Sequence, residues 1–255
     1  MKKISSFLVV LLLMLASFTA GMEYPRGDVN YDGQVSIKDV TCLIDYLLTN
    51  TWPEEPVTPP DDHEYVDLGL PSGTLWATCN VGANAPEEYG DFFAWGETEP
   101  KVLYDWSTYK WCNGSFDNMT KYCTDSSIGM VDNNTELEPE DDAAYANWGD
   151  KWCMPTYDQQ TELRTMCTWT WTTLNGVNGR LVTGPNGASL FLPASGYHSG
   201  SLYRNAGNAC YCWSRSLSTS SSYAYSMDFD SVAVYLGNLH RNFGFTVRAV
   251  RVTQE

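Results

Sequence analysis

The chain has 255 residues, 43% of them hydrophobic, and its 31 acidic residues against 15 basic residues give a formal charge of −16. This length suits one domain of ordinary size with a smaller unit attached, and the apolar content excludes a wholly disordered chain. The negative charge argues against binding to nucleic acids and to anionic membrane surfaces, because both select basic proteins.

The first 21 residues follow the order of a secretory signal peptide. Lys2 and Lys3 precede an apolar run at 7–15, and small residues follow. The run is shorter than the roughly 20 apolar residues of a membrane-spanning helix. No cysteine precedes Cys42, so a lipoprotein's acceptor cysteine is missing from the cleavage region. We expect a secreted, periplasmic or cell-surface protein with no membrane span after the signal peptide is removed.

Residues 28–39 form a predicted calcium-binding loop. Oxygen-bearing side chains recur at alternate positions, and Gly33 lies where such a loop turns sharply. Ca²⁺ takes about six to eight oxygen ligands, and one tight turn can supply most of them. The predicted ligands, with Gln34 acting through its main-chain carbonyl, are Asp28, Asn30, Asp32, Gln34 and Asp39. The alternative is a solvated acidic turn that binds no metal.

A helix is predicted directly after this loop. Apolar residues recur there at helical spacing, namely Ile37, Val40, Leu43, Ile44, Leu47 and Leu48. Only residues 22–27 precede the loop, which leaves no room for the first helix of an EF-hand. The unit at 22–50 resembles one dockerin repeat, although dockerins normally carry two. The resemblance implies Ca²⁺ binding and docking to a cohesin-like or other scaffold protein, whereas the apolar stripe is equally consistent with packing on its own chain.

The segment at 51–63 is a predicted linker, because it contains four prolines and four acids. Residues 64–255 form the predicted larger domain. Glycine, asparagine and serine turns separate short β-rich segments there, which predicts an α+β fold. Expected strands lie at 74–80, 92–95, 167–173, 189–192, 209–214, 231–236 and 245–252, and expected helices at 141–148 and 156–166.

Acidic residues are concentrated in the first half of this domain. Residues 64–150 carry 17 acids and 3 bases, whereas 151–255 carry 5 acids and 8 bases. Six of the acids lie at 132–142, and such a run of like charge predicts a solvated loop.

An exported chain with eight cysteines permits disulfide bonds. Cys112 and Cys123 flank a short polar loop, so a local bridge between them is geometrically easy. Cys210 and Cys212 would face the same side of a strand and could not easily bridge each other.

Several motifs of the larger domain occur together in one known family. The longest is the segment at 65–83, which contains Gly-Leu-Pro-Ser-Gly-Thr-Leu-Trp at 69–76. Further matches lie at 89–97, 152–156, 184–187, 192–196, 212–214 and 245–248. The domain resembles the Fibrobacter succinogenes major paralogous domain, which is abundant in exported proteins of gut Bacteroidetes. The resemblance implies an irregular C-type-lectin-like α+β domain with two main helices. It implies no particular activity.

Four tryptophans are candidates for ligand binding, because flat aromatic faces stack on the apolar faces of sugars. Trp169 and Trp171 alternate along a predicted strand, and Trp106 and Trp111 lie in another aromatic segment. The competing interpretation is that most of these aromatic residues belong to the hydrophobic core. The expected function is that of an exported, calcium-binding, non-catalytic binding or assembly protein that docks or contacts polysaccharide during extracellular polysaccharide use.

The alternatives are a surface adhesin or a glycan-active hydrolase component of a dockerin-bearing complex. Acidic residues are too numerous here to single out a catalytic pair, and the domain has no recognisable hydrolase motif. Ser195 and His198 are too weak a pattern to indicate a catalytic triad.

Overall fold

The computed structural model describes residues 40, 43–44 and 63–251. The chain divides into two units, Met1–Pro60 and Asp61–Glu255. In the first unit, Val40, Leu43 and Ile44 are helical, and the side chains of Val40 and Ile44 are about half exposed. The signal peptide, all five predicted calcium ligands and nearly all of the predicted linker lie outside the described residues.

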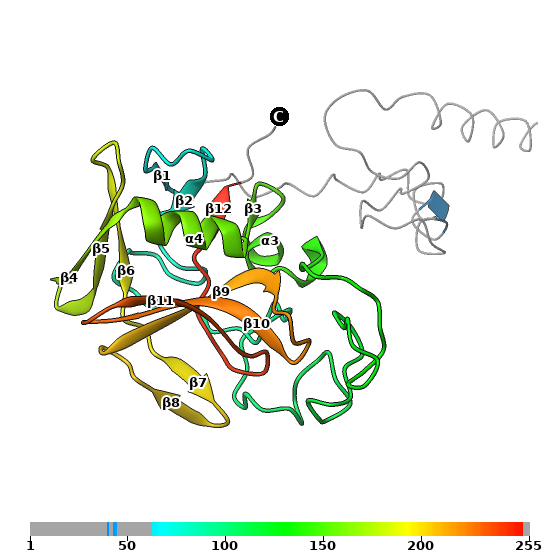
Figure 1. Ribbon diagram of the computed structural model, residues 1–255. Helices are drawn as coiled ribbons and strands as arrows, with labels where there is room; N and C mark the ends of the chain where they lie inside the picture. Colours follow the sequence, from blue (N-terminus) through cyan, green and yellow to red (C-terminus); the bar gives the residue numbers. More distant parts are fainter. Residues whose placement is uncertain (1–39, 41–42, 45–62, 252–255) are drawn as a thin grey trace, which may run out of the picture. The chain divides into compact units, whose positions relative to one another are not determined.

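Short antiparallel strands make up most of the regular structure of the second unit (Figure 1). Two three-stranded sheets have the orders β11-β10-β9 and β4-β5-β6, a four-stranded sheet has the order β1-β2-β12-β3, and β7 pairs with β8. The bounds are β1 (Tyr65–Asp67), β2 (Leu75–Ala77), β3 (Trp152–Cys153), β4 (Thr168–Leu174), β5 (Val177–Thr183), β6 (Ser189–Pro193), β7 (Tyr197–Ser199), β8 (Leu202–Arg204), β9 (Ala209–Leu217), β10 (Tyr223–Asp230), β11 (Val234–His240) and β12 (Val250–Arg251).

Two α-helices occur in the described part of this unit, α3 (Ala143–Trp148) and α4 (Tyr157–Met166), and a 3₁₀ turn, η1 (Pro139–Asp141), precedes α3. Both helix predictions are therefore confirmed, as is the coarse α+β class. A capping box starts α4: the Thr156 hydroxyl accepts a hydrogen bond from the Gln159 N–H, and the Gln159 side chain accepts one from the Thr156 N–H. The helix lies along the β11-β10-β9 sheet (Figure 1).

One of the three apolar clusters lies between two sheets. On β4-β5-β6, alternate residues including Trp169, Val182 and Leu192 point to one face. They pack against Cys210 and Phe229, which belong to β9 and β10. Because successive side chains of a strand point to opposite faces of the sheet, the polar residues next to these apolar ones point away from the cluster. The structure therefore has a sheet-on-sheet core with one open end beside the β4–β5 hairpin.

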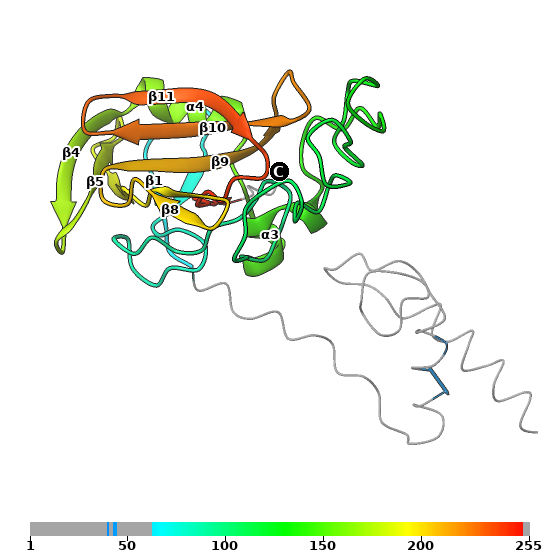
Figure 2. The ribbon, with the colours of Figure 1, turned by 90° about the horizontal axis from the view of Figure 1, so that it is seen from below.

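A long irregular segment connects β2 and α3. Its later part, drawn in green, lies at the opposite end of the β11-β10-β9 sheet from the β4–β5 hairpin (Figures 1 and 2), whereas its earlier part reaches the hairpin, where the Asn175 side chain donates to Glu87 (2.6 Å). Buried arginines hold this segment and its surroundings in place. Arg241 donates to the Tyr109 hydroxyl (2.8 Å) and to the Tyr122 carbonyl (3.0 Å). Arg248 donates to the Asn80 side chain (2.8 Å). Side-chain hydrogen bonds thus replace regular strands in this region.

The acidic run at 132–142 is only partly solvated, so that prediction is wrong for two of its residues. Asp141 and Asp142 are 2% and 0% exposed. Asp141 forms an ion pair with Lys121 (2.7 Å), and Asp142 accepts a hydrogen bond from the Ala144 N–H (2.9 Å) at the start of α3. A cation and a helix N-terminus balance the two charges, which offsets the free-energy cost of burying them.

All seven cysteines in the described part of the chain are free. The local bridge between Cys112 and Cys123 is absent because their thiols point to different carbonyls, those of Trp106 and Asp125, each 3.2 Å away. Cys210 and Cys212 of β9 do share one side of the strand, as expected; their sulfur atoms are 3.5 Å apart, within hydrogen-bond distance, and form no disulfide.

Among the described residues, no helix combines the length and the apolar character that crossing a membrane requires.

Candidate functional site

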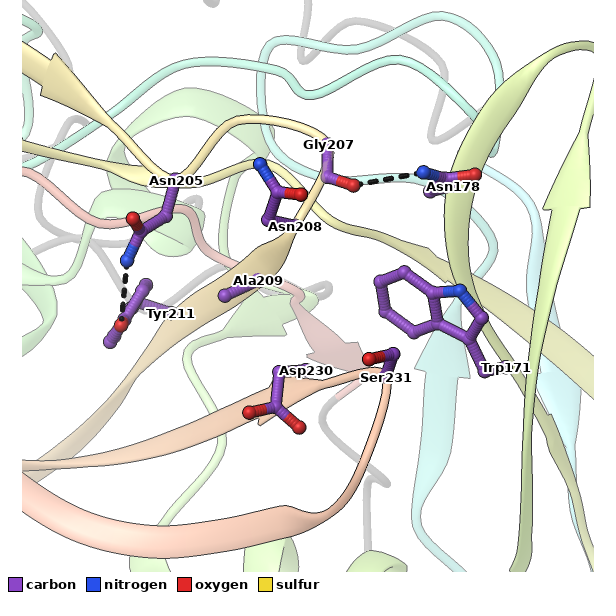
Figure 3. Close-up of a pocket in the computed structure, with 9 residues that line it drawn as sticks. All are labelled: Trp171, Asn178, Asn205, Gly207, Asn208, Ala209, Tyr211, Asp230 and Ser231. Atoms are coloured by element: carbon purple, nitrogen blue, oxygen red, sulfur yellow. Dashed lines mark hydrogen bonds between the residues drawn. The ribbon is translucent and has the colours of Figure 1, made fainter.

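An open pocket of about 510 Å³ lies where the β4–β5 hairpin meets the ends of β9 and β10 (Figure 3). Segments distant in sequence supply its walls: the hairpin, the loop between β8 and β9, and the turn between β10 and β11. Its lining consists of Trp171, Asn178, Asn205, Gly207, Asn208, Ala209, Tyr211, Asp230 and Ser231.

Trp171 forms the aromatic wall of this pocket. It lies on the same face of β4 as Trp169 and directly opposite Arg180 of β5. Trp169 lies further from the hairpin end and packs against Phe229, with the ring centroids 6.0 Å apart. Trp171 is nearer the hairpin turn. Its indole is half-buried, as is that of Trp169, and it borders the open space (Figure 3).

The loop between β8 and β9 supplies amide groups. Asn205 and Gly207 have positive φ angles of 59° and 75°, which lets the chain turn tightly before β9. The Asn178 side chain donates to the Gly207 carbonyl (2.9 Å), and the Asn205 side chain donates to the Tyr211 hydroxyl (3.2 Å), as Figure 3 shows. These bonds orient the amides, and each amide keeps further donor and acceptor capacity for a ligand.

The turn between β10 and β11 supplies a carboxylate. One oxygen of Asp230 accepts hydrogen bonds from the main-chain N–H groups of Val232 (2.7 Å) and Ala233 (2.9 Å). The amides of Ala233 and Val232 lower the pKa of Asp230, so the side chain is ionised at neutral pH. It is an acceptor-only group at the rim of the pocket.

A second carboxyl group, that of Asp228, lies next to the pocket. Asp228 precedes Asp230 by two residues on β10, so both side chains lie on the same face, and Tyr211 is its cross-strand neighbour. The Ser226 hydroxyl donates to it (2.9 Å). Burial raises the pKa of Asp228 to about 7, so the two aspartates differ in charge near neutral pH.

The other tryptophans chosen from the sequence lie outside this pocket. Trp106 packs edge-on against Tyr109 and His240. Trp111 donates its indole N–H to the Gly96 carbonyl (2.6 Å) and packs beside the buried clusters. Trp169 donates to the Leu163 carbonyl (3.3 Å). All four tryptophans are half-buried, and of the four only Trp171 lines the pocket.

The polar residues of the site were not predicted from the sequence. The segment at 205–208, Asn-Ala-Gly-Asn, separates two strands, and a turn with two asparagines was its only signal. Asp230 lies just before the predicted strand at 231–236, whose first half is wrong: residues 231–233 form the turn that Asp230 caps. Nothing local in the sequence connects either segment with Trp171.

Ser195 and His198 have separate partners. The Ser195 hydroxyl is buried against the Cys210 thiol (3.5 Å) and the Thr246 hydroxyl (3.3 Å). The His198 ring stacks on the ring of Tyr203. The two residues therefore do not form a catalytic pair.

Within the described residues, no group of three or more His, Cys, Asp or Glu side chains is arranged to hold a metal ion. The predicted calcium loop at 28–39 lies outside these residues, so its ligands stay a prediction.

No protein-family model, curated protein or solved structure matches this chain.

Proposed function

We propose that this is an exported, non-catalytic binding protein whose pocket takes a carbohydrate, in the service of extracellular polysaccharide use. The observation that supports the proposal is the position of Trp171, half-buried beside three asparagine amides and an ionised carboxylate. Sugars present an apolar ring face and a rim of hydroxyl groups. An aromatic face with a few convergent polar groups complements both.

The size and polarity of the pocket support the same class of ligand. Its volume of about 510 Å³ lies within the range of about 300–1,000 Å³ that is usual for small-molecule sites. Asparagine amides donate and accept, and Asp230 accepts, so hydroxyl groups of either orientation find a partner. A purely apolar ligand would leave these groups unpaired, at a cost in free energy.

Replacing Trp171 by alanine tests this function. We expect Trp171→Ala to lose about fivefold in affinity for the glycan that the wild type retains, because stacking on one aromatic ring contributes on the order of 1 kcal/mol. Affinity would be measured by calorimetry after a glycan-array screen. Trp106→Ala, which alters a tryptophan outside the pocket, is the matched control and should bind normally. Equal affinity of the wild type and Trp171→Ala would contradict the proposal.

We also propose that the loop at 28–39 binds Ca²⁺ and that the unit at 22–50 serves docking to a scaffold protein. The alternation of oxygen-bearing residues in the sequence supports the metal site. The resemblance of the larger domain to the Fibrobacter succinogenes family, with its C-type-lectin-like fold, remains part of this proposal, as does export through the signal peptide.

A further inference from the structure

The strand β4 forms an outer edge of its sheet. The order β4-β5-β6 gives it one neighbour, and all of its residues pair with β5 in an unbroken antiparallel register. In Figures 1 and 2 it lies on the outer side of this sheet, away from β6. Beyond its pairing with β5, the only hydrogen bond that the described residues supply to its main chain runs from Arg180 to the Trp169 carbonyl (3.3 Å). The main-chain groups along this edge are therefore open to another strand.

The other edge strands of the described sheets are protected against such pairing. On β6, Arg248 donates to the Phe191 carbonyl (3.1 Å), and loop segments supply main-chain bonds along the outer side of β9. β11 contains Gly237 and receives a hydrogen bond from Arg164 at its first carbonyl (2.9 Å). The strands β1, β3, β7 and β8 have three residues or fewer. Covered carbonyls, glycine and short length all limit pairing with a further chain.

The sequence of β4 has none of the features that discourage pairing at an edge. Thr-Trp-Thr-Trp-Thr-Thr-Leu contains no charged residue, no proline and no glycine, and no bulge interrupts its register with β5. Its β-branched and aromatic side chains favour extended structure. A long, uncharged edge strand of this kind pairs readily with another strand.

A second copy of the same strand suits this edge. When Thr168–Leu174 is laid antiparallel against itself, the one register that uses the whole strand is centred on Trp171. Thr170 of each copy then lies opposite Thr172 of the other, and threonines pair favourably across strands. Charge repulsion does not oppose this contact, because residues 151–255 carry 8 bases and 5 acids although the whole chain is strongly negative.

We propose that two copies of this protein associate through their β4 strands, which joins their β4-β5-β6 sheets into one continuous sheet across a two-fold axis. The interface is self-complementary, as two-fold symmetry requires. Trp171, which lines the pocket, lies at the axis, directly opposite its counterpart at about 5 Å between Cβ atoms. The two pockets therefore lie side by side, and a single glycan chain can reach both. This last consequence rests on the carbohydrate function proposed above.

Sedimentation equilibrium of the full-length protein tests the association, at concentrations from about 1 μM to about 1 mM. We expect the wild type to change from monomer to dimer within this range, because one strand from each copy makes a small interface. Amide hydrogen exchange locates the contact: protection of N–H groups in β4 should rise with protein concentration.

Charged variants of the edge separate this interface from any other. Thr170→Lys with Thr172→Lys places lysine opposite lysine twice across the axis and should weaken dimerisation about tenfold. Thr170→Glu with Thr172→Glu should do the same, and an equimolar mixture of the two variants should restore the dimer, which unfolded proteins could not do. Thr161→Lys with Thr165→Lys is the matched control, since both positions lie on α4 and neither is buried. It should dimerise like the wild type.

The outcomes distinguish the two proposals. A wild type that stays monomeric, a dimer that the lysine variant and its control form equally, or a mixture that fails to associate would each refute the β4 interface. An oligosaccharide that spans both pockets should bind the lysine variant more weakly than the wild type, and equal binding would show that the pockets do not act together. If the dimer forms and no glycan binds, the interface stands and the carbohydrate function is refuted. If glycans bind to a protein that stays monomeric, the reverse holds.

Discussion

Two neighbouring carboxyl groups of this protein, those of Asp228 and Asp230, have very different environments, and their pKa values are shifted in opposite directions. Asp230 accepts two main-chain hydrogen bonds that favour its charged form, whereas Asp228, two residues earlier on the same strand, accepts one from a hydroxyl group. Burial therefore dominates at Asp228 and raises its pKa from 3.8 to about 7. An acid whose pKa is raised on folding binds its proton more tightly in the native state, so it makes the protein less stable as pH rises.

The substitution Asp228→Asn should remove this pH dependence. Wild-type stability is expected to fall between about pH 4 and pH 7 through Asp228, because the carboxyl must lose its proton in a buried setting. The variant should therefore match the wild type near pH 4 and exceed it by about 1–2 kcal/mol near pH 8. The full shift would correspond to about 4 kcal/mol, but the side chain is partly exposed and the effect is discounted accordingly. Urea unfolding at both pH values measures the difference.

Asp230→Asn is the control for that experiment and should show the opposite trend. The pKa of Asp230 is lowered by the amides of Ala233 and Val232, so its charged form stabilises the wild type at neutral pH and that benefit is lost on acidification. If Asp228→Asn and the wild type have parallel stability profiles from pH 4 to pH 8, the carboxyl of Asp228 is not buried as described.

Among the elements, α4 is the one whose start the sequence specifies most completely. Pro155 precedes Thr156, and Gln159 follows three residues later, so local residue chemistry fixes the N-terminus of the helix. The helix then buries Gln160 and Leu163 against the sheets. Its capping hydrogen bonds satisfy N–H groups that the helix itself leaves unpaired.

Thr156→Ala should cost about 1 kcal/mol of unfolding free energy, because it removes the side-chain half of the capping box. Thr165→Ala, on the exposed end of the same helix, should be neutral or slightly stabilising, since alanine has the higher helix propensity. Chemical denaturation of both variants provides the comparison. A loss in Thr156→Ala no larger than that in Thr165→Ala would show that the cap does not stabilise this helix.

Strands were harder to predict than helices, for physical reasons that differ from strand to strand. β4 and β9 were predicted because β-branched and aromatic residues alternate or cluster in them. β10 was not predicted, even though the large residues Tyr223, Tyr225 and Met227 alternate with smaller or polar residues along it. A register shift between Ala224 and Ser226 changes which residues face the core, and polar residues occur among the buried positions. β5 contains a glycine and a buried arginine, both atypical of strands.

The candidate site was predictable only at Trp171. The residue type and its alternation with Trp169 indicated a possible platform, yet both tryptophans are half-buried and both pack against the same apolar cluster. Only Trp171 lines the pocket, because the segments that complete the pocket are brought to it by the tertiary fold. The asparagines and Asp230 come from turns, whose residues also have purely conformational uses.

At the scale of the whole molecule, the chain consists of two units that divide near residue 60. Among the described residues, the three apolar clusters of the second unit lie between Val66 and Val250. We expect a metal ion bound at 28–39 to stabilise the first unit and to leave the unfolding of the second unchanged.

Calcium titration by calorimetry should detect binding to the chelator-treated full-length protein, and Asp28→Ala with Asp32→Ala should abolish it, because two ligand oxygens are lost. Asp61→Ala with Asp62→Ala removes the same charge outside the loop and should leave the heat of binding unchanged. The main unfolding transition should be the same with calcium and with chelator. Undiminished heat in the loop variant would rule out the loop as the site.

The two buried arginines near the end of the described chain have a consequence for how the protein is made. Arg241 bonds Tyr109 across 132 positions, and Arg248 bonds Asn80 across 168. Contacts of such long range form slowly, because the loops between the partners must close first. During synthesis, the irregular segment between β2 and α3 therefore lacks its hydrogen bonds to Arg241 and Arg248, and its aromatic residues stay exposed to solvent. The contacts that fix this segment therefore cannot form until both arginines have been synthesised.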